Sequence, residues 1–277
     1  MSLLPLATES RRASCFSNLG QQTESSFRLR WDGLLWCAIV LAFFAGRPPV
    51  RAEDGNKQVK DALPVETVVQ QMVLHNQQRA EEIGSYTSRR HYHIEYKGFP
   101  HSAEADLIVD ATCDGPSGRH FEVVSESGSG LLVHHVLMKL LETEAQGASH
   151  HTSNDLTPAN YNFALIRSEI DDGRRMYVLQ VEPKISRSLL YRGAIWVDAQ
   201  DFAVARIEAQ PAKNPSFWIH DTRIHHVYEK TGEFWLPELN KTESKVRLGG
   251  EAILTINYGD YRFLRAGADQ PSVSGAQ

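Results

Sequence analysis

The sequence has 277 residues, of which 42% are hydrophobic and 23% are charged. This composition is typical of one or two globular domains and excludes a largely disordered chain. The formal net charge is −5 at neutral pH, with 29 Lys and Arg against 34 Asp and Glu. Nucleic acid is therefore not an expected partner, because its phosphates attract basic surfaces.

The N-terminal part differs from the rest of the chain. Residues 34–46 (LLWCAIVLAFFAG) are apolar or small throughout, but a membrane-spanning helix needs about 20 residues. Val50 and Ala52 then stand at the −3 and −1 positions of a small-residue cleavage site. We interpret residues 1–52 as a signal peptide with a long n-region, cleaved near Ala52, and expect a periplasmic protein. The alternative is an uncleaved N-terminal membrane anchor.

Two helices are predicted after a linker at residues 53–62. Apolar residues recur at spacings of three, four and seven from Val65 to Ile83, directly after Pro64, which is harmless in a first turn. This pattern predicts an amphipathic helix. A second helix is predicted at residues 131–144 (LLVHHVLMKLLETE), where the apolar arc is wider than one face, so that heavy covering is expected.

Most of the remaining chain reads as strands. About ten runs of alternating polarity, beginning with SYTSRRHYHIEYKG and ending with EAILTINYGDYRF, are separated by Asp-Gly, Thr-Gly and Gly-Gly turn signals. The predicted fold class is mainly β (α+β): a strongly curved antiparallel meander sheet, or unclosed β-barrel, with about two helices covering its concave side. We assign residues 63–263 to this single domain and residues 264–277 to a disordered tail.

Histidines are the first candidates for chemistry. His91 and His93 share one strand face with Glu95, and such a set binds a transition metal when a third ligand is present. The solvent side of a sheet gives the same pattern, so no metal is predicted. Adjacent pairs such as His225 and His226 point to opposite faces of a strand.

Nucleophile-elbow, P-loop, dinucleotide-binding and zinc-protease motifs are absent from the sequence. Neither an enzyme nor a cofactor is expected, and an envelope hydrolase using these histidines is a minor alternative.

A second candidate is the group of carboxylates in YRGAIWVDAQDFAVARIEAQP, residues 191–211. Asp198 and Asp201 bracket four residues suited to a hairpin turn, because short acidic side chains hydrogen-bond nearby backbone N–H groups. Arg206 and Glu208 share a strand face and are expected to pair with neighbouring strands. We interpret the carboxylates as structural, not catalytic.

The same hairpin carries a resemblance. Its pattern of Trp196, Val197 and Asp198, a short turn, then Arg206, Ile207 and Glu208 is similar to the LolA/LolB/RseB-like superfamily of periplasmic lipoprotein carriers and lipoprotein-sensing proteins. The order of helices and strands over residues 60–263 resembles it as well. The resemblance implies an unclosed barrel whose apolar cavity, lidded by helices, holds acyl chains without transforming them. It also permits a sensor of the RseB type that docks on an envelope protein.

On this reading the expected partners are acyl chains of lipoproteins or lipids and an envelope protein. Strand alternation and helical spacing select the candidate ligand contacts. They are Tyr92, Ile94 and Tyr96 on the first strand, Leu107 and Val109 on the second, and Leu137 and Leu141 on the second helix.

Overall fold

The computed structural model describes residues 63–114, 118–146, 155–187, 189–214, 216–247 and 249–264. The predicted signal peptide and linker lie outside these residues, as does the predicted tail apart from Leu264, which ends the last strand.

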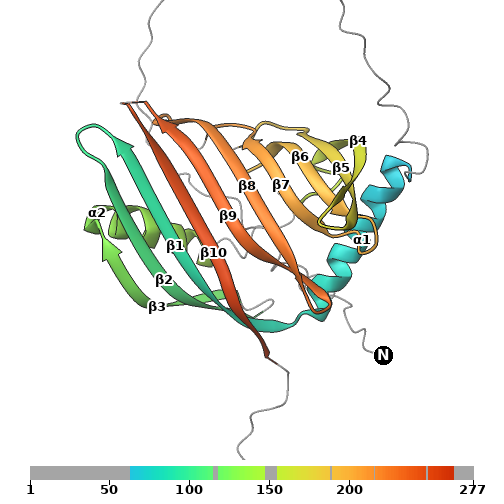
Figure 1. Ribbon diagram of the computed structural model, residues 1–277, viewed down its shortest axis with the longest axis horizontal. Helices are drawn as coiled ribbons and strands as arrows, with labels where there is room; N and C mark the ends of the chain where they lie inside the picture. Colours follow the sequence, from blue (N-terminus) through green and yellow to red (C-terminus); the bar gives the residue numbers. More distant parts are fainter. Residues whose placement is uncertain are drawn as a thin grey trace, which may run out of the picture.

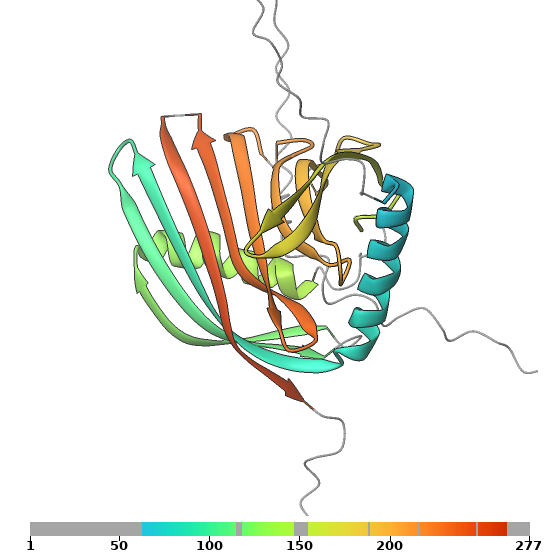
Figure 2. The ribbon, with the colours of Figure 1, turned by 45° about the vertical axis from the view of Figure 1, so that its right-hand side comes forward.

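A ten-stranded antiparallel sheet makes up most of the described chain. It curves strongly and stays open, with β3 and β4 as its two edges (Figures 1 and 2). The predicted fold class is confirmed. The strands are β1 (Ser85–Gly98), β2 (Ala103–Asp114), β3 (Arg119–Gly128), β4 (Tyr161–Asp171), β5 (Arg174–Pro183), β6 (Tyr191–Asp198), β7 (Val204–Pro211), β8 (Ile219–Thr231), β9 (Phe234–Val246) and β10 (Gly250–Leu264).

The strand order is β3-β2-β1-β10-β9-β8-β7-β6-β5-β4. Consecutive strands pair as hairpins, in agreement with the turn signals. In the β4–β5 turn, for example, Asp172 and Gly173 have φ angles of 47° and 74°, the positive values that a two-residue hairpin turn of type I′ needs. One connection differs, because the chain leaves one edge after β3 and enters the other at β4. The first and last strands, β1 and β10, consequently pair inside the sheet.

Two helices accompany the sheet. The first, α1 (Val65–Glu82), follows Pro64 as predicted. The second runs from Gly130 to Gln146 and links β3 to the segment before β4; it consists of α2 (Gly130–Leu132), a π-helical turn η3 (Val133–Leu137) and α3 (Met138–Gln146). We call it the 130–146 helix. Neither is long and apolar enough to cross a membrane, and the same holds for every helix of the described ranges.

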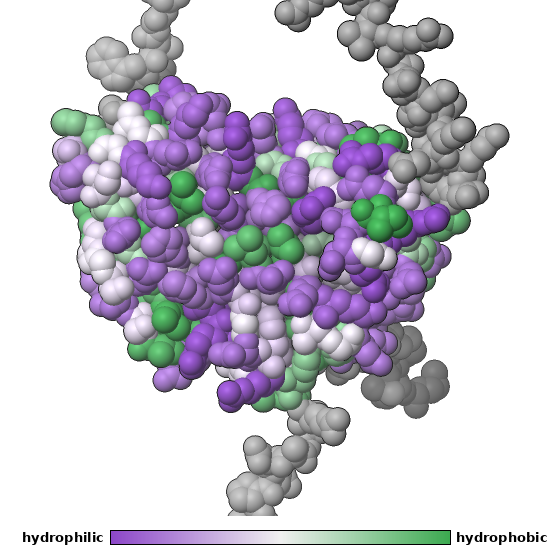
Figure 3. Space-filling view, viewed as in Figure 1, coloured by the Kyte–Doolittle hydropathy of each residue, from purple (hydrophilic) through white to green (hydrophobic). Residues whose placement is uncertain are grey.

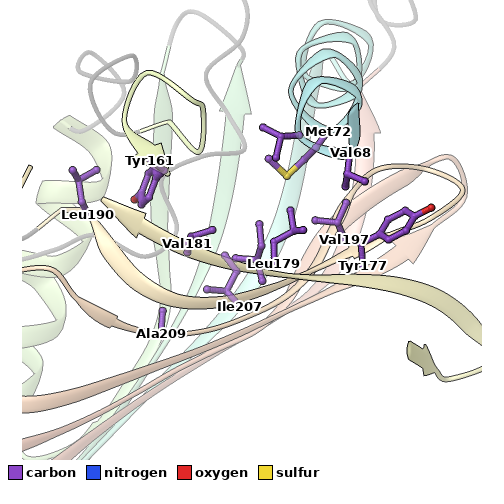
Figure 4. Close-up of a cluster of buried hydrophobic side chains, with 12 residues drawn as sticks. Val68, Met72, Tyr161, Tyr177, Leu179, Val181, Leu190, Val197, Ile207 and Ala209 are labelled. Atoms are coloured by element: carbon purple, nitrogen blue, oxygen red, sulfur yellow. The ribbon is translucent and has the colours of Figure 1, made fainter. Parts of the chain in front are cut away.

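Both helices cover the same face of the sheet. In α1, Val68 and Met72 point toward Leu179 and Val197 of the curved sheet (Figure 4). In the 130–146 helix, Leu137 is buried in a different cluster with strand residues of β1 and β2. Strand residues from both clusters, among them Tyr92 and Leu179, stand in one row of register partners, described below, and the two clusters therefore share a face. This is the concave face, and each helix buries its own part of it.

The opposite, outer face is mostly hydrophilic over β1, β10, β9 and β8 (Figure 3). It carries one small apolar cluster of Met176, Val178, Trp196, Ala203, Ala205 and Trp235. Trp196 points away from Ile195 and Val197, as its alternation predicts, yet it is only 5% exposed. Its Nε1 donates a hydrogen bond to Glu169 at 2.6 Å, and the guanidinium of Arg206 lies 4.0 Å from its ring centroid. Trp196 is thus covered by charged side chains.

Candidate functional site

The concave face is organised by one row of directly opposed residues across eight strands, which we call the central row. From β2 to β5 it contains Leu107, Tyr92, Ile256, Asn240, His226, Ile207, Ile195 and Leu179. Paired residues of neighbouring antiparallel strands point to the same face. The apolar members at the two ends of the row lie beneath the two helices, and the polar members lie between them.

The cluster beneath the 130–146 helix contains most of the predicted ligand contacts. Six of the seven are buried together there: Tyr92, Ile94, Leu107, Val109, Leu137 and Leu141. The strand residues share a face, as their alternation indicates, and Leu137 and Leu141 lie on the side of the helix that meets them. The structure brings these residues together with Ile256 and Tyr258 of β10, which the sequence did not single out.

Tyr96, the seventh predicted contact, lies outside that cluster. It points to the same face as Tyr92 and Ile94 but stands near the end of β1. Its hydroxyl donates to the carbonyl oxygens of Phe99 at 2.8 Å and Gly249 at 3.2 Å. Tyr96 therefore joins the loop after β1 to the loop between β9 and β10, and its polar end is already occupied.

Sequence reasoning missed a buried ion pair in the same cluster. Arg90 Nη1 lies 3.0 Å from Glu144 Oε2, and the two side chains are 2% and 6% exposed. The hydroxyl of Tyr92 lies 3.3 Å from Glu144 Oε1. Burial alone would lower the pKa of the Arg90 guanidinium. The neighbouring Tyr92 and Glu144 raise this pKa by more than burial lowers it, so the arginine stays charged.

A signal for this pair exists in the sequence. Arg90 precedes Tyr92 and Ile94 at a spacing of two, so alternation places its side chain on the concave face. Glu144 follows Leu137 and Leu141 at helical spacing, so it faces the sheet. A charge on each buried face predicts an ion pair, but only once the helix is known to lie over β1.

Arg90 also contacts two aromatic rings inside the molecule. Its guanidinium carbon lies 5.2 Å from the ring centroids of Phe121 and Tyr258. The hydroxyl of Tyr258 is buried without a hydrogen-bond partner, and burial raises the pKa of this phenol well above its ordinary value. The cluster under the 130–146 helix is therefore apolar apart from a small group of buried polar atoms around Arg90.

The histidines of β1 lie on the outer face. His91 Nε2 and His93 Nδ1 both lie 2.7 Å from Asp106 Oδ1, and His93 Nε2 lies 3.3 Å from Glu95. The hydrogen bond to Asp106 raises the pKa of His93. Within the described ranges, His, Cys, Asp and Glu form no group of three or more that is suited to holding a metal ion. The imidazoles are held by carboxylates in the way that surface histidines on a sheet commonly are.

The carboxylates of the β6–β7 hairpin have structural partners. Asp198 Oδ1 accepts hydrogen bonds from the backbone N–H groups of Gln200 at 2.9 Å and Asp201 at 2.7 Å, and Asp198 Oδ2 lies 2.6 Å from Arg174 Nε. Asp201 Oδ2 accepts from Lys230 and Trp235. The carboxylates hold the turn and tie it to β5, β8 and β9, as their sequence positions suggested.

An open depression of about 610 Å³ lies over β5 to β9. Its charged lining consists of Arg192, Glu208, Arg223, His225, Lys241 and Glu243, which alternate in register with the buried residues of the concave face. The depression therefore belongs to the outer face. Charges of both signs stand together there, for example Lys241 and Glu243 at 2.7 Å. This mixed, solvated lining does not suit an acyl chain.

No family model matches this chain, and no curated protein matches it significantly. Several solved structures are similar to the chain. A DUF1329 family protein from Desulfovibrio piger has a TM-score of 0.41 at 14% identity, covering 74% of this chain and 95% of that one. A putative outer membrane lipoprotein-sorting protein domain from Vibrio parahaemolyticus has 0.36 at 12%, covering 74% and 93%. The LolA superfamily protein NE2245 from Nitrosomonas europaea has 0.33 at 10%, covering 76% and 96%. The likeness to these structures is one of fold alone.

Proposed function

We propose that this protein is an exported carrier or binder of lipids or lipidated proteins, which holds acyl chains between the concave face and its helices without a chemical step. The observation that carries the proposal is the presence on one concave face of two separate apolar clusters, each covered by its own helix. Two separate helices can each leave their part of the sheet while the sheet itself stays paired.

In such an exchange the burial of an acyl chain would offset the loss of the helix contacts. Burial of an acyl chain contributes about 0.8 kcal/mol per CH₂ group, so about ten buried methylenes contribute about 8 kcal/mol before the costs of binding. A chain that replaces Leu137 and Leu141 against Tyr92 and Leu107 exchanges one apolar contact for another. The sheet beneath would keep its hydrogen bonds throughout.

The ion pair between Arg90 and Glu144 supports a defined closed position of the 130–146 helix. Buried ion pairs contribute little net stability because both charges lose water, but they specify geometry. Here the pair joins β1 to α3, within the cluster that the helix covers. Opening would separate two charges that water then solvates, so the closed and open states need not differ greatly in free energy.

The first test is direct. The protein is purified from the cells that produce it, extracted with organic solvent and examined by mass spectrometry, and the delipidated protein is titrated with a fluorescent fatty acid. We expect acylated molecules in the extract and saturable uptake of the probe. An extract without acyl chains, combined with no uptake, would overturn the proposal.

The 130–146 helix offers a matched pair of variants for the titration. Leu137 is fully buried against the sheet, whereas Leu131 on the same helix is 67% exposed. Leu137→Asp places a carboxylate where the chain is expected to lie and should abolish uptake, while Leu131→Asp should bind as the unmodified protein does. Circular dichroism establishes that both variants keep the sheet. Equal binding by both variants would place the chain elsewhere.

A second candidate function, docking on an envelope protein, is favoured by an exposed aromatic pair. Phe217 and Trp218, before β8, are 68% and 52% exposed and pack edge to face at 5.4 Å, with the guanidinium of Arg247 4.3 Å from the Phe217 ring centroid. Large exposed aromatics are typical of interaction sites. Crosslinking in intact cells should recover one partner in stoichiometric amount, and Phe217→Ser with Trp218→Ser should abolish its recovery. Unchanged recovery with the double variant would contradict this candidate.

A further inference from the structure

The two apolar clusters are separated by a strip of polar residues on the concave face. It consists of Thr222 and His226 of β8 with Asn240, Thr242 and Ser244 of β9, which we call the polar strip. In the central row, Asn240 and His226 stand between Ile256 on one side and Ile207 on the other. In the next row, Thr242 stands between Leu254 and Ile224. The concave face is thus polar between the parts that its two helices cover.

Four of the five residues of the strip are as buried as the apolar residues beside it. Thr222, His226, Asn240 and Ser244 are 5%, 4%, 8% and 7% exposed. A buried polar group without a hydrogen-bond partner destabilises a fold, and apolar residues of similar size would fit a filled core better. Four buried polar residues on two neighbouring strands therefore require a reason beyond filling space.

Hydrogen bonds within the protein account for only part of the strip. Thr222 Oγ1 and Ser244 Oγ lie 2.9 Å apart and satisfy each other, and His226 hydrogen-bonds the side chain of Asn240. The other ring nitrogen, His226 Nε2, is buried and has no partner. The Thr222 and Ser244 pair can be explained by the pairing of β8 with β9, whereas the free nitrogen of His226 cannot.

The chemistry of the strip selects against charged groups. Its hydroxyl, amide and imidazole groups are uncharged, since burial lowers the pKa of His226 to about 4. Arg90, the buried cation of the neighbouring cluster, is already paired with Glu144. A carboxylate or phosphate placed at the strip would be buried without a counter-charge, which is strongly unfavourable. A carbonyl oxygen or an amide N–H would instead find hydrogen-bonding groups.

We propose that the polar strip binds the uncharged linkage of an acylated ligand, an ester or amide group, while the attached chain lies over a neighbouring apolar cluster. This inference rests on the proposed function and narrows its ligand class to neutral acyl esters and amides. Free fatty acids, whose head is a carboxylate, are the disfavoured alternative. The position between the clusters lets a ligand with several chains place them on both sides.

The test compares ligands that share one chain. Purified, delipidated protein is titrated calorimetrically with 1-monolauroylglycerol, lauramide and laurate at mildly alkaline pH, where laurate is ionised. We expect both neutral ligands to bind about tenfold more tightly than laurate, which corresponds to one buried hydrogen bond. Laurate binding as tightly as the neutral ligands would overturn the inference but leave the proposed function standing. Failure of all three ligands to bind would overturn the proposed function itself.

A pair of neighbouring histidines supplies the control. The double variant His226→Leu with Asn240→Leu should reduce the preference for neutral ligands to less than about twofold. His225→Leu changes the adjacent residue on the outer face and should preserve the preference. A double variant that keeps the full preference would show that the linkage binds elsewhere.

A measurement on the unmodified protein covers the case in which the double variant does not fold. The ring nitrogen resonances of His226, observed by NMR, should shift on addition of 1-monolauroylglycerol, because His226 Nε2 gains a hydrogen-bond partner. The resonances of His225 should not shift. Saturation of the protein by the neutral ligand without a change at His226 would overturn the inference.

Discussion

Arg90 of β1 and Glu144 of α3 form an ion pair at 3.0 Å inside the molecule, 54 residues apart in the chain. The pair fixes the 130–146 helix to the one strand that also contacts β10 and β2. A neighbouring pair, Arg89 with Asp110 at 2.8 Å, lies on the outer face with both side chains more than 40% exposed. Two consecutive arginines thus make the same kind of contact in opposite surroundings.

The buried pair should contribute to folding chiefly through the cost of breaking it. Glu144→Ala leaves the Arg90 guanidinium buried without its counter-charge and should lower the free energy of unfolding by about 3–5 kcal/mol. The double variant Arg90→Met with Glu144→Leu should be close to the unmodified protein, since both charges are removed together. Denaturation in urea measures both. Asp110→Ala is the control, and a loss as large for Asp110→Ala as for Glu144→Ala would refute this explanation.

His226 should make the protein less stable in acid. Its pKa is about 4 when folded against an ordinary value of about 6.5, so the unfolded chain takes up a proton between these values and the folded chain does not. Stability should therefore be complete above about pH 6.5 and should fall by about 3 kcal/mol as pH drops to about 4. His226→Gln should remove this component from the pH dependence of unfolding. If the pH dependence of unfolding is the same in His226→Gln as in the unmodified protein, the pKa of His226 is not lowered by folding.

His93 should show the opposite dependence. Its pKa is raised by the hydrogen bond to Asp106, with Glu95 also acting in that direction, so the protonated form stabilises the folded state. This contribution is complete below the unfolded pKa of about 6.5 and is lost as pH rises through the folded value. His93→Gln should therefore destabilise the protein in acid and have little effect at alkaline pH. NMR titration of the ring checks the direction of the shift independently.

Asp198 should matter for the hairpin through its backbone contacts as well as through its charge. Asp198→Ala removes the acceptor of two backbone N–H groups and the partner of Arg174, and should cost about 3 kcal/mol. Asp198→Asn keeps an oxygen for the backbone N–H groups and should cost clearly less. Thermal unfolding ranks the two variants. Equal losses would assign the effect to the ion pair with Arg174 instead of the turn.

Much of the fold was predictable because it is encoded locally. The turn of Asp172 and Gly173 specifies its own hairpin, and the alternation around Tyr92 specifies a face. The pairing of β1 with β10 has no such local signal, because its strands come from opposite ends of the domain and are brought together only by the whole sheet. The candidate site follows the same division: spacing indicates which apolar residues share a face, whereas Arg90 with Glu144 and His226 with Asn240 depend on contacts between elements distant in sequence.

The position of β10 has a consequence for the order in which the protein can fold. Tyr92 cannot pair with Ile256 until nearly the whole domain has been synthesised. Closing so long a loop is entropically costly and slow. Until then β1, β2 and β3 form one sheet fragment and β4 to β9 another, with four unpaired edges between them. Such edges readily recruit other chains. The last strand of the domain, β10, thus joins the two parts of the sheet. A chain without it would consist of two separate, aggregation-prone sheet fragments.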